Sequence, residues 1–214
     1  MPDAALLVLN PRRIPSCIAA IEALEIPTCW LSYMTEVNVA GAFNLVVRAT
    51  EFDRYLVMSD DAEPTQAALD KVLELHDQDR STVATGYCNL DSVLPQVNLT
   101  RNRLPAPPPQ ISSYDLLTQD DVDAFGDDPF TSTFAGFSLT CMSRQAWLDV
   151  PLQTTALGGQ MDYSTSWRLQ ELGALIVTHR DTRIQHVKEQ WNRADSAPEK
   201  RTLVGQRAPE IRWS

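Results

Sequence analysis

The chain is short of positive charge. Its 214 residues hold 18 lysines and arginines against 28 aspartates and glutamates, a formal net charge of −10. A negative net charge repels polyanions and disfavours general binding of DNA or RNA. A local positive patch, such as one at Arg101 and Arg103, could still bind a nucleic acid. No apolar run is long enough to span a membrane, and no basic stretch followed by an apolar one opens the chain. We therefore expect neither a membrane span nor a secretory signal.

Cysteine is also scarce. The four cysteines, at positions 17, 29, 88 and 141, form no C-x-x-C pair. This spacing argues against a zinc ribbon and against a thioredoxin-like redox site. Reduced, buried thiols are the expected state, and they suit a cytoplasmic protein.

Glycine is missing from the turn after the first expected strand. Residues 4–9 are continuously apolar and are followed by Asn-Pro-Arg-Arg-Ile-Pro. Rossmann dinucleotide-binding domains and P-loops need a glycine-rich loop at this point. Nucleotidyltransferases usually carry one as well, with a lysine or arginine. The absence argues against all three classes, and a nucleotidyltransferase stays as the enzymatic alternative.

What the sequence does have is an alternation of strands and helices. Strands are expected at residues 4–9, 28–33, 54–58 and 81–87, and helices at 16–24, at 39–47 and from Pro64 onward. Three strand–helix units followed by a strand predict an α/β fold, with a mostly parallel sheet flanked by helices. We place a single domain at residues 1–192.

The second half of the chain is less regular. Prolines at 105 and 107–109 exclude a helix or a central strand, so we expect a long loop region at 94–130. Beyond it the expected elements are strands at 134–142, 174–178 and 183–187, and helices at 143–148 and 162–172. Residues 193–214 are polar and mixed in charge, and we predict a C-terminal tail or lid.

Two adjacent carboxylates directly follow the third strand, where Ser59, Asp60 and Asp61 succeed an apolar run. Open α/β sheets bind ligands at the carboxyl ends of their strands. Side-by-side carboxylates repel each other unless a cation lies nearby, and a hard divalent ion carrying phosphate is the commonest one. The alternative is that the acids cap the helix that Pro64 begins.

A second pattern surrounds Asp162. A glycine pair at 158–159 leads to this aspartate, Arg168 lies six residues beyond it, and Gly173 ends the helix. Taken alone, the pattern describes a helix whose N-cap is Asp162.

Histidines are few, at positions 76, 179 and 186. His186 lies on a late strand, and His179 is its rival for any ligand role. His76 lies on the apolar face of a helix, where we expect it to pack in the core.

The joint order of these features resembles that of GT-A fold glycosyltransferases, in particular the inverting family 2. Residues 59–61 resemble the D-x-D motif of that fold. Residues 158–173 resemble a second signature, in which a glycine-rich loop leads into Glu-Asp and an arginine follows six residues later. Met161 replaces the usual glutamate, and Ser164 replaces a frequent second aspartate. The resemblance covers residues 4–188.

This resemblance implies a metal-dependent glycosyltransferase that moves a sugar, with inversion, from a nucleotide-sugar donor to an acceptor hydroxyl. It implies Mn²⁺ or Mg²⁺ held by Asp61 and His186, Asp162 as the base, and Asp60 near the ribose or sugar of the donor. A UDP-sugar is the default donor. Position at strand ends adds further donor-binding candidates, which are Asn10, Pro11, Arg13 and Glu36.

Other interpretations stay open at this point. Met161 and Ser59 are compatible with an inactive GT-A-like module that binds a nucleotide without turnover. The acceptor is open between a saccharide, a lipid-linked sugar, a protein side chain and a modified nucleobase, and so is the oligomeric state.

Overall fold

The computed structural model describes residues 3–10, 14–32, 36–79, 82–89, 95–105, 116–153, 161–187 and 210–214. In these ranges the helices are α1 (Pro15–Glu22), α2 (Glu36–Ala49), α3 (Gln66–Gln78), α4 (Gln119–Asp123), α5 (Arg144–Asp149), α6 (Met161–Glu171) and the 3-10 helix η2 (Arg180–Thr182). The strands are β1 (Ala4–Asn10), β2 (Thr28–Ser32), β3 (Arg54–Ser59), β4 (Ala62–Glu63), β5 (Val83–Thr85), β6 (Tyr87–Cys88), β7 (Gln96–Thr100), β8 (Leu116–Thr118), β9 (Phe130–Ser132), β10 (Thr140–Ser143), β11 (Ile176–Thr178), β12 (Arg183–His186) and β13 (Glu210–Trp213).

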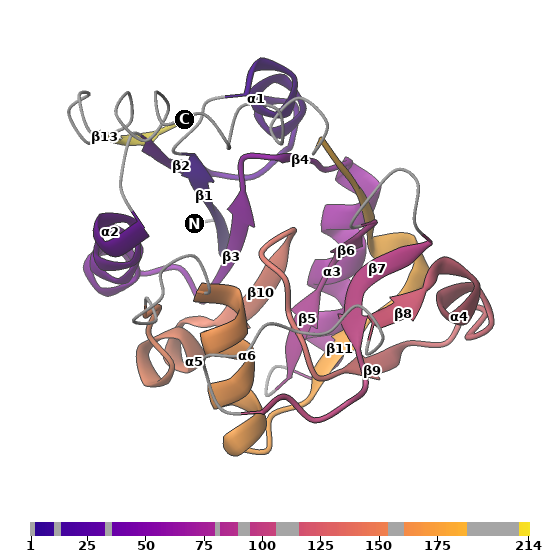
Figure 1. Ribbon diagram of the computed structural model, residues 1–214. Coiled ribbons are helices and arrows are strands. Elements are labelled where there is room, and N and C mark those ends of the chain that lie inside the picture. The colour runs from indigo at the N-terminus through magenta and orange to yellow at the C-terminus, as the bar shows by residue number, and fades with distance from the viewer. Residues whose placement is uncertain are drawn as a thin grey trace, which may run out of the picture.

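An eight-stranded sheet forms the centre of the described structure, in the order β13-β2-β1-β3-β10-β5-β11-β9 (Figure 1). β1 pairs in parallel with β2 and β3, and β5 pairs in parallel with β11. β10 lies between β3 and β5 and is antiparallel to both. The predicted α/β class with a helix-flanked sheet is therefore confirmed, with antiparallel strands mixed into it.

Helices cover both faces of this sheet (Figure 1). Apolar residues of α2, α5 and α6 pack on one face, and those of α1 and α3 pack on the other. In β1, Leu7 and Leu9 belong to the first cluster, whereas Leu6 and Val8 belong to the second. Because successive side chains of a strand point to opposite faces, burial of both faces explains the unbroken apolar run.

The helix after the acidic turn begins later than predicted. Thr65, not an acid and not Pro64, is the N-cap of α3, and its side chain accepts a hydrogen bond from Ala68 N at 3.2 Å. The strand β4 separates Asp61 from that helix. The helix-cap interpretation of Asp60 and Asp61 is therefore wrong, because the threonine hydroxyl already supplies the acceptor.

The region predicted as a long loop contains regular elements. β7 and β8 pair antiparallel, and α4 and β9 follow them. Val97 and Leu99 of β7 are buried against Tyr87, Val122 and Phe130, which gives this region a small core of its own. The predicted loop at 94–130 is wrong for these elements, and residues 106–115 lie outside the described ranges.

Two further boundaries differ. β10 begins only at Thr140, so residues 134–139 are not a strand. Within the segment predicted as a tail or lid, β13 pairs antiparallel with β2, and the ring of Trp213 stacks on Phe52 at 5.6 Å. The division into a domain at 1–192 and a tail stays a prediction.

In the described part of the chain, no helix combines the length and the apolar character that crossing a membrane requires.

Candidate active site at the carboxyl end of β3

The acidic turn is held by backbone hydrogen bonds from three directions. Ser59 N donates to Phe137 O at 2.7 Å, and Asp60 N donates to Leu9 O at the end of β1 at 3.1 Å. Val187 N, just past β12, donates to Asp61 O at 2.8 Å. Segments far apart in the sequence therefore meet at this turn and fix its backbone.

Strand pairing brings His186 to Asp61. β12 is antiparallel to β4, with His186 opposite Ala62. This register places His186 Nε2 3.4 Å from Asp61 Oδ2, with side chains 17% and 14% exposed. His186 Nδ1 is buried and has no hydrogen-bond partner among the described residues. The two residues predicted to hold a metal thus lie side by side.

His179 does not share this arrangement. It is the N-cap of η2, where its Nδ1 accepts a hydrogen bond from Asp181 N at 3.1 Å. Nε2 must then carry the ring proton, which it donates to Asp127 O at 3.0 Å. Both ring nitrogens of His179 therefore have hydrogen-bond partners.

His76 is buried in α3, as its apolar surroundings in the sequence predicted.

Asp162 lies in the first turn of α6, and its Oδ1 accepts a hydrogen bond from Tyr163 N at 2.8 Å. Burial raises the pKa of the Asp162 carboxyl to about 6, and the negative charge of Asp61 adds to that rise, while the Tyr163 N–H opposes it. Asp61 is therefore near enough to Asp162 for its charge to contribute to the pKa of that carboxyl.

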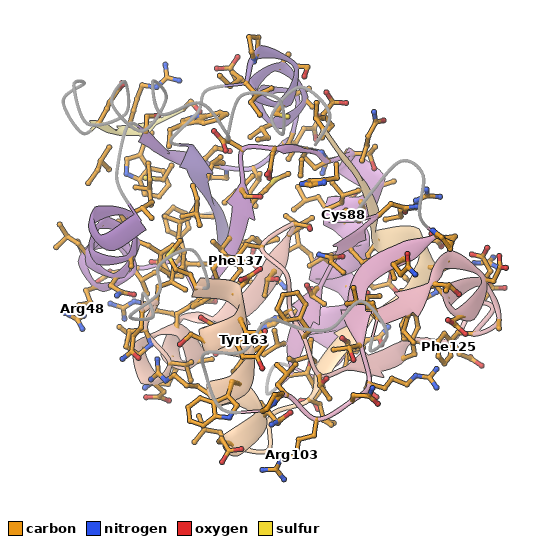
Figure 2. All side chains as sticks on the ribbon, in the orientation of Figure 1. Arg48, Cys88, Arg103, Phe125, Phe137 and Tyr163 are labelled. Carbon is orange, nitrogen blue, oxygen red and sulfur yellow. The ribbon has the colours of Figure 1, made fainter. Side chains whose placement is uncertain are left out.

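A short segment links the acidic turn to the helix of Asp162. Phe137 accepts from Ser59 N, as described above, and Ala135 N donates to Ser166 Oγ at 2.9 Å (Phe137 is labelled in Figure 2). The same Ser166 hydroxyl donates to Asp162 O at 2.7 Å. Sequence reasoning missed Ser166; its position one helical turn after Asp162 was the only available signal.

Gly136, at the centre of this segment, has no room for a side chain. A Cβ there would lie 2.2 Å from Asn98 Nδ2. Asn98 is itself committed, since it donates to Ser138 Oγ at 3.0 Å and accepts from Cys88 N at 2.7 Å. The close packing keeps the segment in place between the turn and α6.

We expect Gly136→Ala to lower the free energy of unfolding by about 1–3 kcal/mol, because the methyl group must displace Asn98 from its hydrogen bonds. Urea unfolding measures this change. Gly41→Ala in α2 is the matched control, because a Cβ at Gly41 meets nothing within 4 Å and alanine favours a helix. Equal unfolding curves for the two variants would contradict the packing argument.

The surroundings of the turn are acidic. The pKa of the Cys17 thiol is raised to about 12, mainly by burial, and the nearby carboxylates of Glu63, Asp60 and Asp61 contribute to that rise. Asp60 is only 1% exposed, and its predicted contact with a donor stays a prediction. A concentration of negative charge of this kind suits a bound cation.

Among the described residues, no group of three or more histidine, cysteine, aspartate or glutamate side chains is placed to hold a metal ion. Asp61 and His186 form a pair instead. A pair is sufficient where a nucleotide diphosphate and water complete the coordination, the usual arrangement for Mg²⁺ at phosphate sites.

The other predicted donor-binding residues are less well defined. Asn10 ends β1 and Glu36 begins α2, but their side chains are not among those described. Pro11 and Arg13 lie outside the described ranges.

Arg168, the arginine six residues after Asp162, donates hydrogen bonds to the carbonyl oxygens of Pro151 and Asp149. It therefore connects α6 to the end of α5.

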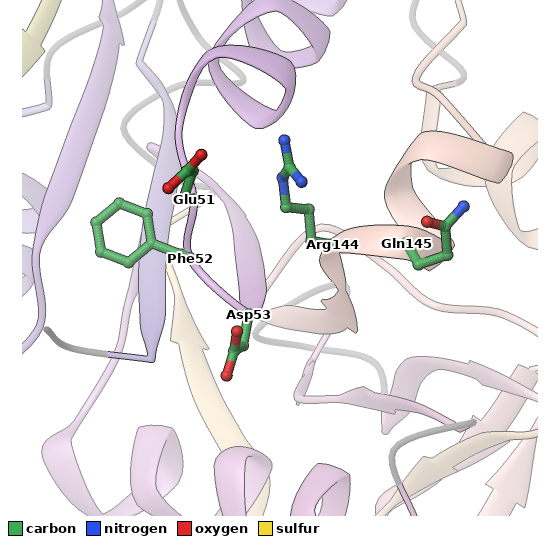
Figure 3. Close-up of a pocket in the computed structure, with 5 residues that line it drawn as sticks. All are labelled: Glu51, Phe52, Asp53, Arg144 and Gln145. Carbon is green, nitrogen blue, oxygen red and sulfur yellow. The ribbon is translucent and has the colours of Figure 1, made fainter.

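An open cavity of about 290 Å³ lies away from this site (Figure 3). Its lining residues are Glu51, Phe52, Asp53, Arg144 and Gln145. The first three precede β3 and the last two follow β10, so the cavity lies at the amino end of β3. The acidic turn lies at the opposite end of that strand, and the cavity is therefore not the predicted donor site.

Comparison with known proteins supports the fold only. No protein-family model and no curated protein sequence matches the chain. The structure of A197 from STIV aligns with a TM-score of 0.55 and 14% identity, over 83% of this chain and 81% of that one. A structure of GalNAc-T7 with UDP, GalNAc and Mn²⁺ aligns with a TM-score of 0.57 and 8% identity, over 87% of this chain. The alignment covers 44% of the GalNAc-T7 chain, so this protein spans less than half of that length. The chain therefore shares the α/β fold of these two structures.

Proposed function

We propose that the protein is a metal-dependent glycosyltransferase that moves a sugar from a nucleotide-sugar donor to an acceptor hydroxyl, with inversion at the anomeric carbon. One observation carries this proposal: Asp61 Oδ2 lies 3.4 Å from His186 Nε2 at the carboxyl end of β3. The contribution of the Asp61 charge to the raised pKa of Asp162, although smaller than that of burial, supports a common site for this pair and that carboxylate. The fold shared with the GalNAc-T7 structure, which contains UDP and Mn²⁺, adds support.

The chemistry of the pair fits Mn²⁺ or Mg²⁺. Two adjacent ligands of one ion, each about 2.1 Å from it, lie about 3 Å apart. Asp61 Oδ2 and His186 Nε2 are close to that spacing at 3.4 Å. The carboxylate of Asp61 suits these ions, and oxygens of the diphosphate and of water would supply further ligands, whereas imidazole is a more usual ligand of zinc, copper, iron and nickel. When bound, the ion would supply positive charge to the departing nucleoside diphosphate.

Asp162 supplies the base in this proposal. Its carboxylate takes the proton of the acceptor hydroxyl as the oxygen attacks the anomeric carbon from the side opposite the diphosphate. A pKa of about 6 makes it a stronger base than an ordinary aspartate, yet leaves it ionised at neutral pH. The hydrogen bond from Ser166 to Asp162 O holds the first turn of α6 in place for this transfer.

We expect kcat/KM to rise with pH through about 6 and to level off above it, because the base acts only when it has lost its proton. Well below this pKa the loss is about tenfold per pH unit. A pH–rate profile at saturating Mn²⁺ measures the effect, and circular dichroism at each pH checks that the protein stays folded. A flat profile between pH 5 and 8 would argue against Asp162 as the base.

Calorimetric titration with UDP and with GDP, each with and without Mn²⁺, tests the proposed function. Binding of one nucleotide only when Mn²⁺ is present supports a donor site and identifies the donor base. Release of that nucleotide from its sugar then separates an enzyme from an inactive binding module. Absence of binding under every condition would overturn the proposal.

A further inference from the structure

The Asp61 carboxylate is contacted at both of its oxygens. Ser59 Oγ donates a short hydrogen bond to Oδ1, while Oδ2 faces His186 Nε2. The two contacts come from different elements, since Ser59 ends β3 and His186 ends β12. Together they set the plane of the carboxylate and determine which oxygen faces the imidazole.

Ser59 is itself held firmly. It pairs with Leu9 in the parallel ladder of β1 and β3, and its amide donates to Phe137 O. Its hydroxyl is thus presented from a rigid strand end rather than from a loop. Such a support keeps a functional group in its working geometry.

We propose that Ser59 is a positioning residue of the metal site, whose hydroxyl orients Asp61 so that Oδ2 meets the ion together with His186. This inference rests on the proposed function. A carboxylate that loses a hydrogen bond to one oxygen rotates more freely and must be ordered again when the ion binds. Loss of such a supporting contact typically weakens metal binding about 10–100-fold. In the sequence, Ser59 was compatible with an inactive module. Its hydrogen bond to Asp61 Oδ1 instead gives it a structural role at the proposed metal site.

Three substitutions at one position separate this role from simple packing. Ser59→Thr keeps a hydroxyl and adds a methyl group that a strand accommodates. Ser59→Ala removes the donor, and Ser59→Cys keeps the approximate shape but donates only weakly. The measurement is the Mn²⁺ dissociation constant by calorimetry, at a saturating concentration of whichever of UDP and GDP the unmodified protein binds, with a thermal melt of each variant.

We expect Ser59→Ala and Ser59→Cys to weaken Mn²⁺ binding about tenfold or more, and Ser59→Thr to stay within about threefold of the unmodified protein. Unchanged Mn²⁺ affinity in the Ala or Cys variant would overturn the role of Ser59, as would equal weakening in all three. If the unmodified protein binds no Mn²⁺ with either UDP or GDP, the proposed function itself fails, whereas Mn²⁺ binding that the substitutions leave unchanged overturns the role of Ser59 alone.

Discussion

Replacing Asp162 with asparagine should abolish sugar transfer while leaving the binding of nucleotide and metal nearly unchanged. The asparagine amide keeps an oxygen that can accept the hydrogen bond from Tyr163 N, so the start of α6 should hold its shape. It cannot take a proton from the acceptor, and loss of a general base typically costs about 10²–10⁴ in rate. Single-turnover transfer and calorimetric binding, measured on the same preparation, check both parts.

Asp128→Asn is the matched control for this substitution. Asp128 is exposed and lies in the turn after α4, and the same change of charge there should leave transfer intact. An equal loss of transfer and of nucleotide binding in Asp162→Asn would contradict the assignment of Asp162 as base. Full transfer activity in that variant would contradict it as well.

The regular half of the fold was predictable because its signals are local. β1 to β3 are strands buried on both faces, and such strands are rich in apolar residues on both faces, as the continuous apolar run of β1 shows. The position of the acids after β3 followed from the same pattern. The later strands are short and pair across long sequence distances; β10, for example, lies between β3 and β5. No short window of sequence contains that information.

Residues 134–139 show how tertiary contacts override a local pattern. The run is mostly apolar and was predicted to be a strand, yet Gly136 packs against Asn98 and the segment instead reaches both the acidic turn and α6. The predicted start of α3 at Pro64 was wrong for a smaller reason: proline is typical of a first helical turn, but here Thr65 follows it and is the N-cap.

The candidate site was predicted in part. The family resemblance paired Asp61 with His186, and the structure brings them together through β4 and β12. The supporting serines were not predicted as such. A serine is common everywhere in sequences, and its partner depends on the register of distant strands and helices. Ser59 and Ser166 become informative only once their hydroxyl contacts are known.

Replacing Asp61 with alanine should remove the dependence of nucleotide binding on metal. Without its carboxylate only His186 remains of the proposed pair, and we expect the dissociation constant of the nucleotide in Mn²⁺ to rise about 100-fold or more, to its metal-free value. Calorimetry with and without Mn²⁺ measures this, and Asp128→Ala serves as the control. A variant that still binds the nucleotide more tightly when Mn²⁺ is added would show that the ligand lies elsewhere.

The same variant offers a second measurement that needs neither metal nor turnover. The charge of Asp61 contributes to the raised pKa of Asp162, although burial contributes more. Removing that charge should therefore lower the pKa of Asp162 from about 6 toward its ordinary value, without restoring it fully. Titration of the Asp162 carboxyl carbon by NMR in metal-free buffer detects the shift. An unchanged pKa would mean that Asp61 and Asp162 do not face a common site. It would contradict the proposal that Asp61 binds the metal and Asp162 acts as the base in the same reaction.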